Sequence, residues 1–277
     1  MVLAVDTETT GADFLHGCKP FFVATCDEEG VQTYWEAEVD PKTRIPKWSS
    51  KSRQEIKAHL RNKKLVFHNA KFDIHALKSI GINVWNLASR IDDTLIASHL
   101  LNSYESHALK DLALKYLDIS TSDEKELQEV VNQSRRIGRL LSWRVAKKGD
   151  PHFPALKISP KQGWWQLDMW LPAAVYRYYQ GKKSAEKNLE DIYSEEKFSF
   201  VLQKYCLQDV VRTLLLWRIF KEEITSRELK KQYEVRRRLL RTTYRMESVG
   251  ITLRPEVLAS EIDRYSCLLY TSDAADE

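Results

Sequence analysis

Two acidic residues stand one position apart near the start of the chain, where an apolar segment ends. Asp6 and Glu8 follow the run Met1–Val5, and on a β-strand residues i and i+2 point to the same face, about 7 Å apart. Carboxylates placed in this way repel each other unless a proton or a cation lies between them. Oxygen ligands favour Mg²⁺ or Mn²⁺. These two residues are a candidate metal site. A DxE motif that stands alone in a sequence, however, is more often a solvent-exposed strand end.

Two further pairs of residues, each with a spacing of four, could complete such a site. Asn69 and Asp73 lie in the segment FHNAKFD, where a helix is expected to begin. The ordinary interpretation is that Asn69 caps this helix and that Asp73 lies in its first turn. Tyr205 and Asp209 lie in a helical stretch, where residues four apart share a face and present a phenol beside a carboxylate. Each pattern alone carries little weight, and their value comes from their order along the chain.

The elements that must position these residues alternate between strand and helix in the first part of the chain. The pattern predicts strands at Met1–Val5, Pro20–Cys26, Val31–Trp35, Lys64–Phe67 and Arg90–Asp92. It predicts helices at Ser52–Leu60, Lys71–Ile80, Thr94–Leu101 and His107–Tyr116. Later segments are mainly helical, with one helix from near Ala185 past Trp217 and another from near Arg227 to Gly250. We therefore expect an α/β fold, a sheet flanked by helices and followed by a helical extension.

Composition and charge narrow the class of protein. The net charge is +4, and two basic stretches, residues 131–163 and 221–245, suit a phosphate backbone, although each could equally be a solvated helix face. The sequence lacks a GxxxxGK phosphate loop, which argues against an NTPase. It also lacks an apolar run of about 20 residues, so we expect no membrane association. The four cysteines form no CxxC pair, and we expect a reducing, cytoplasmic location.

Taken in order, the three motifs resemble those of the DEDD exonuclease superfamily. The family has DxE, NxxxD and YxxxD in its tyrosine branch, and position 204 is Lys, so the pattern of the histidine branch is absent. The resemblance covers about residues 1–219 and includes RIDDT at Arg90–Thr94 and the helix His107–Leu117. It implies a ribonuclease H-like mixed sheet and a 3′→5′ exonuclease that releases nucleoside 5′-monophosphates.

The resemblance also implies how the acidic residues and the tyrosine work. Asp6, Glu8 and Asp209 would hold one divalent ion, Mg²⁺ or Mn²⁺. Asp6 would bridge this ion to a second one, which Asp73 would support directly or through water. Tyr205 and Glu8 would orient the attacking water. These five residues are the expected catalytic set, and the four carboxylates among them are the expected metal ligands.

Two later segments make the resemblance more specific. Tyr233–Leu253 resembles the helix and turn that link the proofreading and polymerase domains of family A DNA polymerases, and Asp168–Ala174 resembles an element of bacteriophage members. We therefore expect the proofreading part of a phage-type family A polymerase, active in the host cytoplasm. Its substrate would be the 3′ end of single-stranded DNA, positioned by Asn69 and the backbone near Thr9.

The expected organisation has three parts. Residues 1–222 would form the exonuclease domain, and residues 223–266 would begin a truncated polymerase domain whose remainder, encoded by the same gene, is the missing partner. Residues 267–277, CLLYTSDAADE, resemble the translation of a sequencing-library adapter. We expect the native reading frame to stop near Ser266.

Two other functions fit the same sequence. A free-standing exonuclease that acts on RNA or DNA would carry the same three motifs. A non-catalytic module that binds nucleic acid is a different class. This alternative is weaker than the two enzymes, because clustered negative charge that faces phosphates would not help a protein to bind nucleic acid. A metal-dependence assay on a 3′-labelled strand separates the module from both enzymes.

Overall fold

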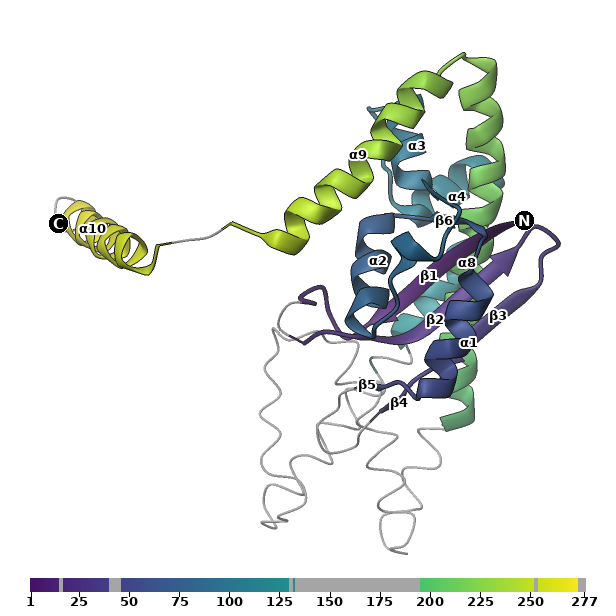
Figure 1. Cartoon of the computed structure of the whole chain (residues 1–277), viewed down its shortest axis with the longest axis horizontal. Helices are drawn as coiled ribbons and strands as arrows, with labels where there is room; N and C mark the ends of the chain where they lie inside the picture. Colours follow the sequence, from purple (N-terminus) through teal and green to yellow (C-terminus); the bar gives the residue numbers. More distant parts are fainter. Residues whose placement is uncertain (15–16, 40–45, 130–131, 133–194, 252–253, 274–277) are drawn as a thin grey trace, which may run out of the picture. The chain divides into compact units, whose positions relative to one another are not determined.

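The computed structural model of this chain describes residues 1–14, 17–39, 46–129, 132, 195–251 and 254–273 (Figure 1). The chain divides into two compact units, Met1–Arg237 and Arg238–Glu277. Two features singled out in the sequence lie outside the described residues. They are the phage-like element at 168–174 and almost all of the basic stretch at 131–163.

The first unit is built on a five-stranded mixed sheet with the order β3-β2-β1-β6-β7. Its strands are β1 (Val2–Thr9), β2 (Pro20–Asp27), β3 (Gln32–Glu36), β6 (Lys64–Phe67) and β7 (Arg90–Asp93). The central strand β1 is antiparallel to β2 and parallel to β6, and β6 is parallel to β7. Two short strands, β4 (Glu38–Val39) and β5 (Pro46–Lys47), pair separately. The predicted ribonuclease H-like mixed sheet is confirmed.

Helices complete the first unit close to their predicted positions. They are α1 (Ser50–Leu60), α2 (Ala70–Ser79), the short 3₁₀ helix η1 (Val84–Asn86), α3 (Thr94–Leu101), α4 (Leu109–Leu117) and α8 (Glu195–Ser226). Residues 122–129 are also helical. The long helix α8 packs against α3, α4, β1 and β2, and therefore brings the distant motif at 205–209 to the central strand.

The first strand extends beyond the apolar run that predicted it. That run ends at Val5, and β1 continues through the acidic pair to Thr9. It does so because antiparallel pairing with β2 persists beyond the apolar run, with Asp6 opposite Ala24 and Glu8 opposite Phe22. The two acidic residues therefore lie within the strand, where ladder hydrogen bonds fix their direction.

A hydrophobic core holds α8 against α3, α4 and the sheet. Its buried members are Val66, Ala97, Leu112, Leu216, Trp217, Phe220, Ile224 and Tyr233. Toward its N-terminal half, α8 continues to bury side chains at helical spacing, at Leu202, Cys206 and Val210. Asp209 interrupts this buried face with only 6% of its surface exposed. A carboxylate in such a position requires charged or hydrogen-bonding partners.

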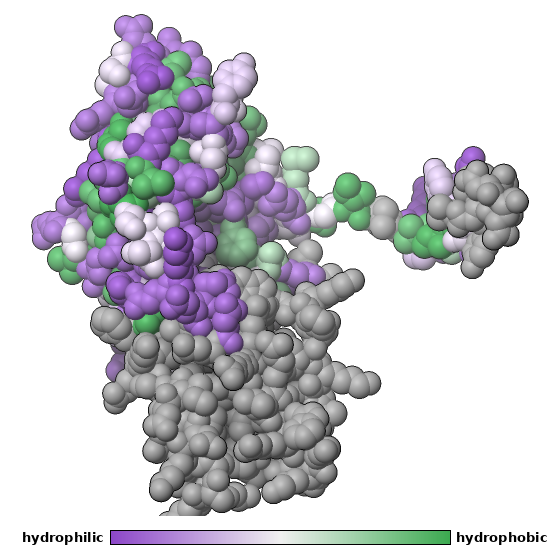
Figure 2. Space-filling model, turned by 180° about the vertical axis from the view of Figure 1, so that it is seen from behind, coloured by the Kyte–Doolittle hydropathy of each residue, from purple (hydrophilic) through white to green (hydrophobic). Residues whose placement is uncertain are grey.

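The second unit contains most of α9 (Lys230–Val249) and all of α10 (Pro255–Asp273). Helix α10 continues past Ser266, where the native frame is expected to stop. The face shown in Figure 2 is mostly hydrophilic over the described part of the first unit. In the second unit, large apolar side chains such as Val249 and Ile251 are 85% and 90% exposed. Within the described residues, no helix combines the length and apolar character that crossing a bilayer requires.

Candidate active site

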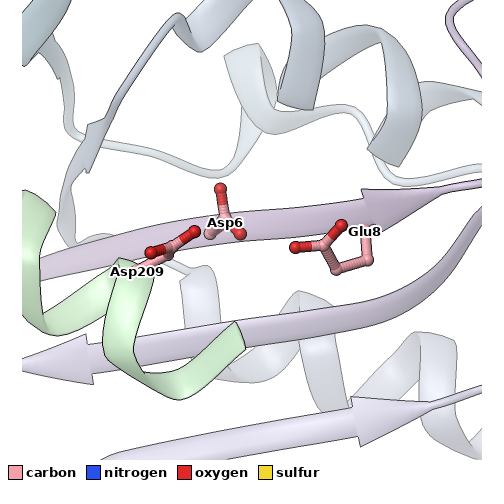
Figure 3. A group of neighbouring side chains, drawn as sticks. All are labelled: Asp6, Glu8 and Asp209. Carbon is pink, nitrogen blue, oxygen red and sulfur yellow. The ribbon is translucent and has the colours of Figure 1, made fainter. Parts of the chain in front are cut away.

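Strand β1 directs its side chains alternately to two helices. Thr7 lies between the two acidic residues, and its hydroxyl donates to Asp73 Oδ1 of α2 over 2.7 Å. Asp6 and Glu8 point the other way, toward Asp209 of α8 (Figure 3). Helices α2 and α8 therefore meet opposite faces of the same strand, and each brings one acidic residue to it.

Three of the four expected carboxylates converge. The ligand oxygens of Asp6, Glu8 and Asp209 lie within 4.8 Å of one another, although the first two residues are about 200 positions from the third. Asp6 and Glu8 are half-buried and Asp209 is buried. The predicted grouping of these three residues agrees with this geometry. The spacing is also suitable for one cation to be shared by all three.

The cluster is electrostatically unfavourable by itself. Burial, followed by the negative charge of the neighbouring Asp209, raises the pKa of Asp6 to about 7. Burial, Asp6 and Asp209 together hold the pKa of Glu8 well above its usual range. The positive charge of Lys110 acts against both shifts. Each shift reflects negative charge that is removed from water without sufficient compensation, which a cation would relieve.

The fourth carboxylate, Asp73, lies outside this group. It is 2% exposed in the first turn of α2 and accepts the hydrogen bond from Thr7. Burial, with the nearby charge of Asp6 as the next contribution, raises the pKa of Asp73 well above its usual value. The negative charge of Asp6 therefore acts on Asp73, although the Asp73 carboxylate is hydrogen-bonded to Thr7 and lies outside the cluster.

The start of α2 differs from the simple helix cap that the sequence suggested. Asn69 occupies the cap position in a left-handed conformation (φ 70°, ψ 55°), but among the described residues its side chain makes no capping hydrogen bond. The carboxylate of Asp93 takes that role and accepts from the backbone N–H groups of Asn69 (3.2 Å) and Ala70 (2.8 Å). The same carboxylate caps α3 through Leu95 N–H (2.8 Å). Because Asp93 caps the helix, the exposed amide of Asn69 is not needed for capping.

The remaining predicted residues lie beside the cluster. Burial, followed by the charges of Asp209 and Glu8, raises the pKa of the Tyr205 phenol, so the hydroxyl keeps its proton and can donate a hydrogen bond. Thr9 ends β1, and its hydroxyl donates to Gly11 O over 3.0 Å. This hydrogen bond closes the turn that follows the strand.

Three charged residues at the site were not identified from the sequence. Arg212 is 1% exposed and donates to both oxygens of Asp123 (2.6 and 2.7 Å) and to Asp209 Oδ1 (2.9 Å). The ammonium of Lys110 also contacts Asp209 Oδ1 and lies 3.6 Å from Asp123 Oδ2. Arg212 follows Asp209 by three residues, which is a helical spacing that could have suggested the pair. Nothing local could have suggested Lys110 or Asp123.

Comparison with known proteins identifies the family. The family model for a 3′-5′ exonuclease, the exonuclease domain found in family A DNA polymerases, matches residues 1–143. The chain therefore belongs to this 3′-5′ exonuclease family, which confirms the family resemblance of its motifs. The match ends before Tyr205 and Asp209.

One curated relative and two solved structures are also similar. DNA polymerase DpoZ of Salmonella phage PMBT28 is 27% identical over 198 residues, which cover 70% of this chain and 28% of that protein. The chain thus spans just over a quarter of this relative. Brucella melitensis NrnC with bound Mg²⁺ is 19% identical, with 90% and 86% of the two chains covered and a TM-score of 0.49. The POL domain of Pol1 from M. smegmatis, complexed with DNA primer-template and dNTP, is 13% identical, with 80% and 45% covered and a TM-score of 0.33.

Proposed function

We propose that this exonuclease domain is the proofreading part of a family A DNA polymerase and removes nucleoside 5′-monophosphates from the 3′ ends of single-stranded DNA. The observation that carries the proposal is the convergence of Asp6, Glu8 and Asp209 within 4.8 Å. A carboxylate cluster of this kind has no use in binding phosphates directly, because like charges repel. It is useful if cations lie between the protein and the phosphate.

The residues present fit a pair of divalent ions. Asp6, Glu8 and Asp209 offer only oxygen ligands, which suit Mg²⁺ or Mn²⁺. Burial and mutual repulsion raise the pKa values of Asp6 and Glu8 despite the nearby Lys110, which is the electrostatic setting that a bound cation would relieve. Asp6 would bridge to a second ion, which Asp73 would support, since the two carboxylates are close enough for the charge of Asp6 to raise the pKa of Asp73. Bound ions of this type activate water and stabilise the charge that develops on a phosphoryl group.

The protein's own groups would position the water and the substrate. Tyr205 keeps its phenolic proton and would donate it to a hydrogen bond that, together with Glu8, orients the water. The side-chain amide of Asn69, which Asp93 relieves from capping, would contact the terminal nucleotide, and the backbone near Thr9 would contact its sugar. No side chain forms a covalent bond with the substrate in this scheme.

The polymerase context is part of the same proposal. It rests on the similarity to a phage DNA polymerase over 70% of this chain and on the linker-like segment that begins at Tyr233. Residues 1–222 would be the exonuclease domain, and residues 223–266 would lead into the polymerase domain, which is the expected partner. The site of action would be the host cytoplasm.

A time course of digestion tests the proposal. A single-stranded DNA labelled at its 3′ end should lose its label in Mg²⁺ and keep it when EDTA is present. Asp6→Ala should abolish the release, whereas Glu29→Ala, which removes an exposed carboxylate in the turn after β2, should not. Full activity in folded Asp6→Ala protein would reject the assignment of the site.

The same assay separates the alternatives. Equal rates on RNA and DNA of one sequence would favour a free-standing exonuclease over a proofreading domain. Binding without any metal-dependent cleavage would indicate a non-catalytic module. The proposed function predicts cleavage with a preference for DNA.

A further inference from the structure

Lys110 places a positive charge inside the carboxylate cluster. It projects from α4, and its ammonium contacts Asp209 Oδ1 and lies 4.1 Å from the centre of the Tyr205 ring. Only 15% of its side chain is exposed. The charge also acts on Asp6 and Glu8, whose pKa values it lowers against the effect of burial. One ammonium therefore partly neutralises the same three carboxylates that would bind a divalent ion.

Two cations share Asp209 Oδ1, but they are held very differently. Arg212 is almost fully buried and is fixed by Asp123 and by Ser120 O at 2.9 Å. It could not leave Asp209 without breaking a bidentate ion pair. Lys110 has a flexible four-carbon stem, and its second carboxylate, Asp123, is 3.6 Å away. Lys110 is therefore the cation that can move.

The position of Lys110 suggests where it would move. The scissile phosphate must approach the carboxylate cluster on the side of Tyr205, because the phenol is expected to orient the attacking water. An ammonium that already lies over the Tyr205 ring needs only a short rotation of its stem to reach a phosphate oxygen there. Lysine acts well as a point charge on phosphates.

We propose that Lys110 exchanges partners during the reaction. It is the counter-ion of Asp209 when no metal is bound, and it becomes a catalytic residue that binds a non-bridging oxygen of the terminal phosphate once metal and substrate are present. This inference rests on the proposed function, because it assumes that divalent ions and a phosphodiester occupy the cluster. In the free protein, Lys110 would compete with the metal ion for Asp209. During the reaction, Lys110 would stabilise the negative charge of the transition state.

The first test measures metal binding to the free protein, without substrate. Mn²⁺ titrations followed by electron paramagnetic resonance should give Lys110→Met an affinity about tenfold higher than the unsubstituted protein, because the competing charge is gone. Lys110→Arg should bind as weakly as the unsubstituted protein. Lys115→Met is the matched control on the same helix, since Lys115 is 53% exposed and pairs with Glu105. It should leave Mn²⁺ affinity unchanged.

The second test measures kcat at saturating Mn²⁺ on a 3′-labelled strand. Lys110→Met should lose about 10²-fold, as when one donor to a developing charge is removed, and Lys110→Arg should recover part of that loss. Lys110→Gln, which is polar and of similar length, repeats both measurements if Lys110→Met melts at a lower temperature by circular dichroism.

The outcomes separate this inference from the proposed function. Weaker Mn²⁺ binding in both Lys110→Met and Lys110→Gln would mean that Lys110 merely supports Asp209, and would overturn the inference. An unchanged kcat in these variants would equally overturn it. If the unsubstituted protein showed no metal-dependent cleavage, the proposed function would fall together with the phosphate role, while tighter Mn²⁺ binding in Lys110→Met would still establish the counter-ion role.

Discussion

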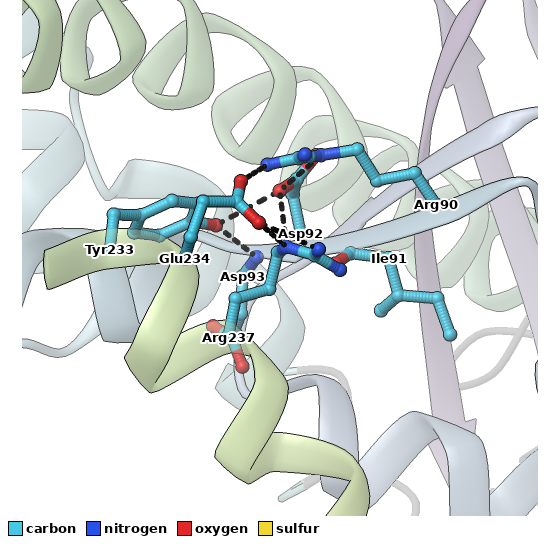
Figure 4. A network of polar contacts seen from close by, with 7 residues as sticks. All are labelled: Arg90, Ile91, Asp92, Asp93, Tyr233, Glu234 and Arg237. Carbon is cyan, nitrogen blue, oxygen red and sulfur yellow. Dashed lines mark hydrogen bonds and ion pairs between the residues drawn. The ribbon is translucent and has the colours of Figure 1, made fainter. Parts of the chain in front are cut away.

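Two polar networks in the first unit contain similar residues but balance their charges in opposite ways. In the first network, Arg90 of β7 binds Asp92 (2.7 Å) and Glu234 of α9 (2.5 Å), and Arg237 binds Glu234 (2.8 Å) (Figure 4). The two carboxylates of this network are paired with its two arginines. The second network is the carboxylate cluster, where Asp6 and Glu8 face Asp209 and the bases lie mainly on Asp209 and Asp123.

The pKa shifts record this difference. Hydrogen bonds from Arg237 and Arg90 lower the pKa of Glu234, so its charged form is favoured in the folded protein. Burial and Asp209 raise the pKa of Asp6 to about 7, so its charged form is disfavoured. A network whose charges are satisfied stabilises a fold, whereas one with excess negative charge is suited to bind a cation. The comparison thus supports the proposal that the second network is the one that binds metal.

The largest expected effect is on catalysis at the cluster. Asp6→Asn keeps the shape of the side chain but removes the bridging charge, and should lower the rate of 3′-end cleavage by about 10³-fold or more. Its urea midpoint without metal should not fall, because a repelled charge is removed. Steady-state rates and urea unfolding, measured on the same preparation, check both statements. If the urea midpoint of Asp6→Asn fell together with its cleavage rate, the carboxylate cluster would be a structural network, as the Arg90 network is.

The next effect concerns stability at the other network. Asp92 is 3% exposed and bound by Arg90, and the Tyr233 hydroxyl donates to it over 3.3 Å. Asp92→Ala leaves these partners unpaired and should lower the free energy of unfolding by about 3 kcal/mol. Urea unfolding of this variant beside Glu29→Ala, an exposed control, would show it. A loss below about 1 kcal/mol would mean that the network contributes little to folding.

A smaller effect distinguishes the networks by pH. The pKa of Asp6 is about 7 in the folded protein and about 4 in the unfolded chain. Its contribution to stability is therefore fully present below about pH 4 and is lost as the pH rises through 7. We expect the metal-free protein to lose about 2 kcal/mol between pH 5 and 8 relative to Asp6→Asn, a difference that Mn²⁺ should abolish.

Glu234 should show the opposite sign. Because its pKa is lowered, its contribution is present above the unfolded pKa and is lost as the pH falls through the folded value. Unfolding curves of Glu234→Gln and of the unsubstituted protein should therefore converge at acidic pH. Curves that stayed parallel between pH 3 and 6 would argue against this ion pair.

The smallest expected effect compares one tyrosine from each network. Tyr205→Phe should reduce the cleavage rate about tenfold, because a group that orients water is lost. Tyr233→Phe should instead lower the melting temperature and leave the cleavage rate unchanged, since the Tyr233 hydroxyl accepts from Asp93 N–H (3.1 Å) within the folded framework. An unchanged rate for Tyr205→Phe would remove Tyr205 from the mechanism.

The parts of the site that depend on local spacing could be predicted from the sequence. Strand alternation gave the common face of Asp6 and Glu8, and helical spacing placed Asp209 beside Tyr205. The meeting of these two elements came from the resemblance to a family, because periodicity says nothing about which elements pack together. Residues that act through distant partners were missed for the same reason, as Lys110 contacts a residue 99 positions away.

The details around Asp73 and Asn69 show the same limit. The sequence correctly placed both at the start of a helix, which the structure begins at Ala70. It could not show that Asp93, 24 positions beyond Asn69, caps that helix. Nor could it show that Asp73 would be held by Thr7 on the face of β1 opposite Asp6. Both features depend on how β7 and α2 approach β1, which is a tertiary property.

The most direct test of the central claim is a crystal structure with Mn²⁺ and a nucleoside 5′-monophosphate, in which anomalous scattering locates the metal. We expect an ion in contact with the carboxylates of Asp6, Glu8 and Asp209, and the ammonium of Lys110 on the phosphate. An absence of anomalous signal at these three residues, at Mn²⁺ concentrations that support cleavage, would contradict the account.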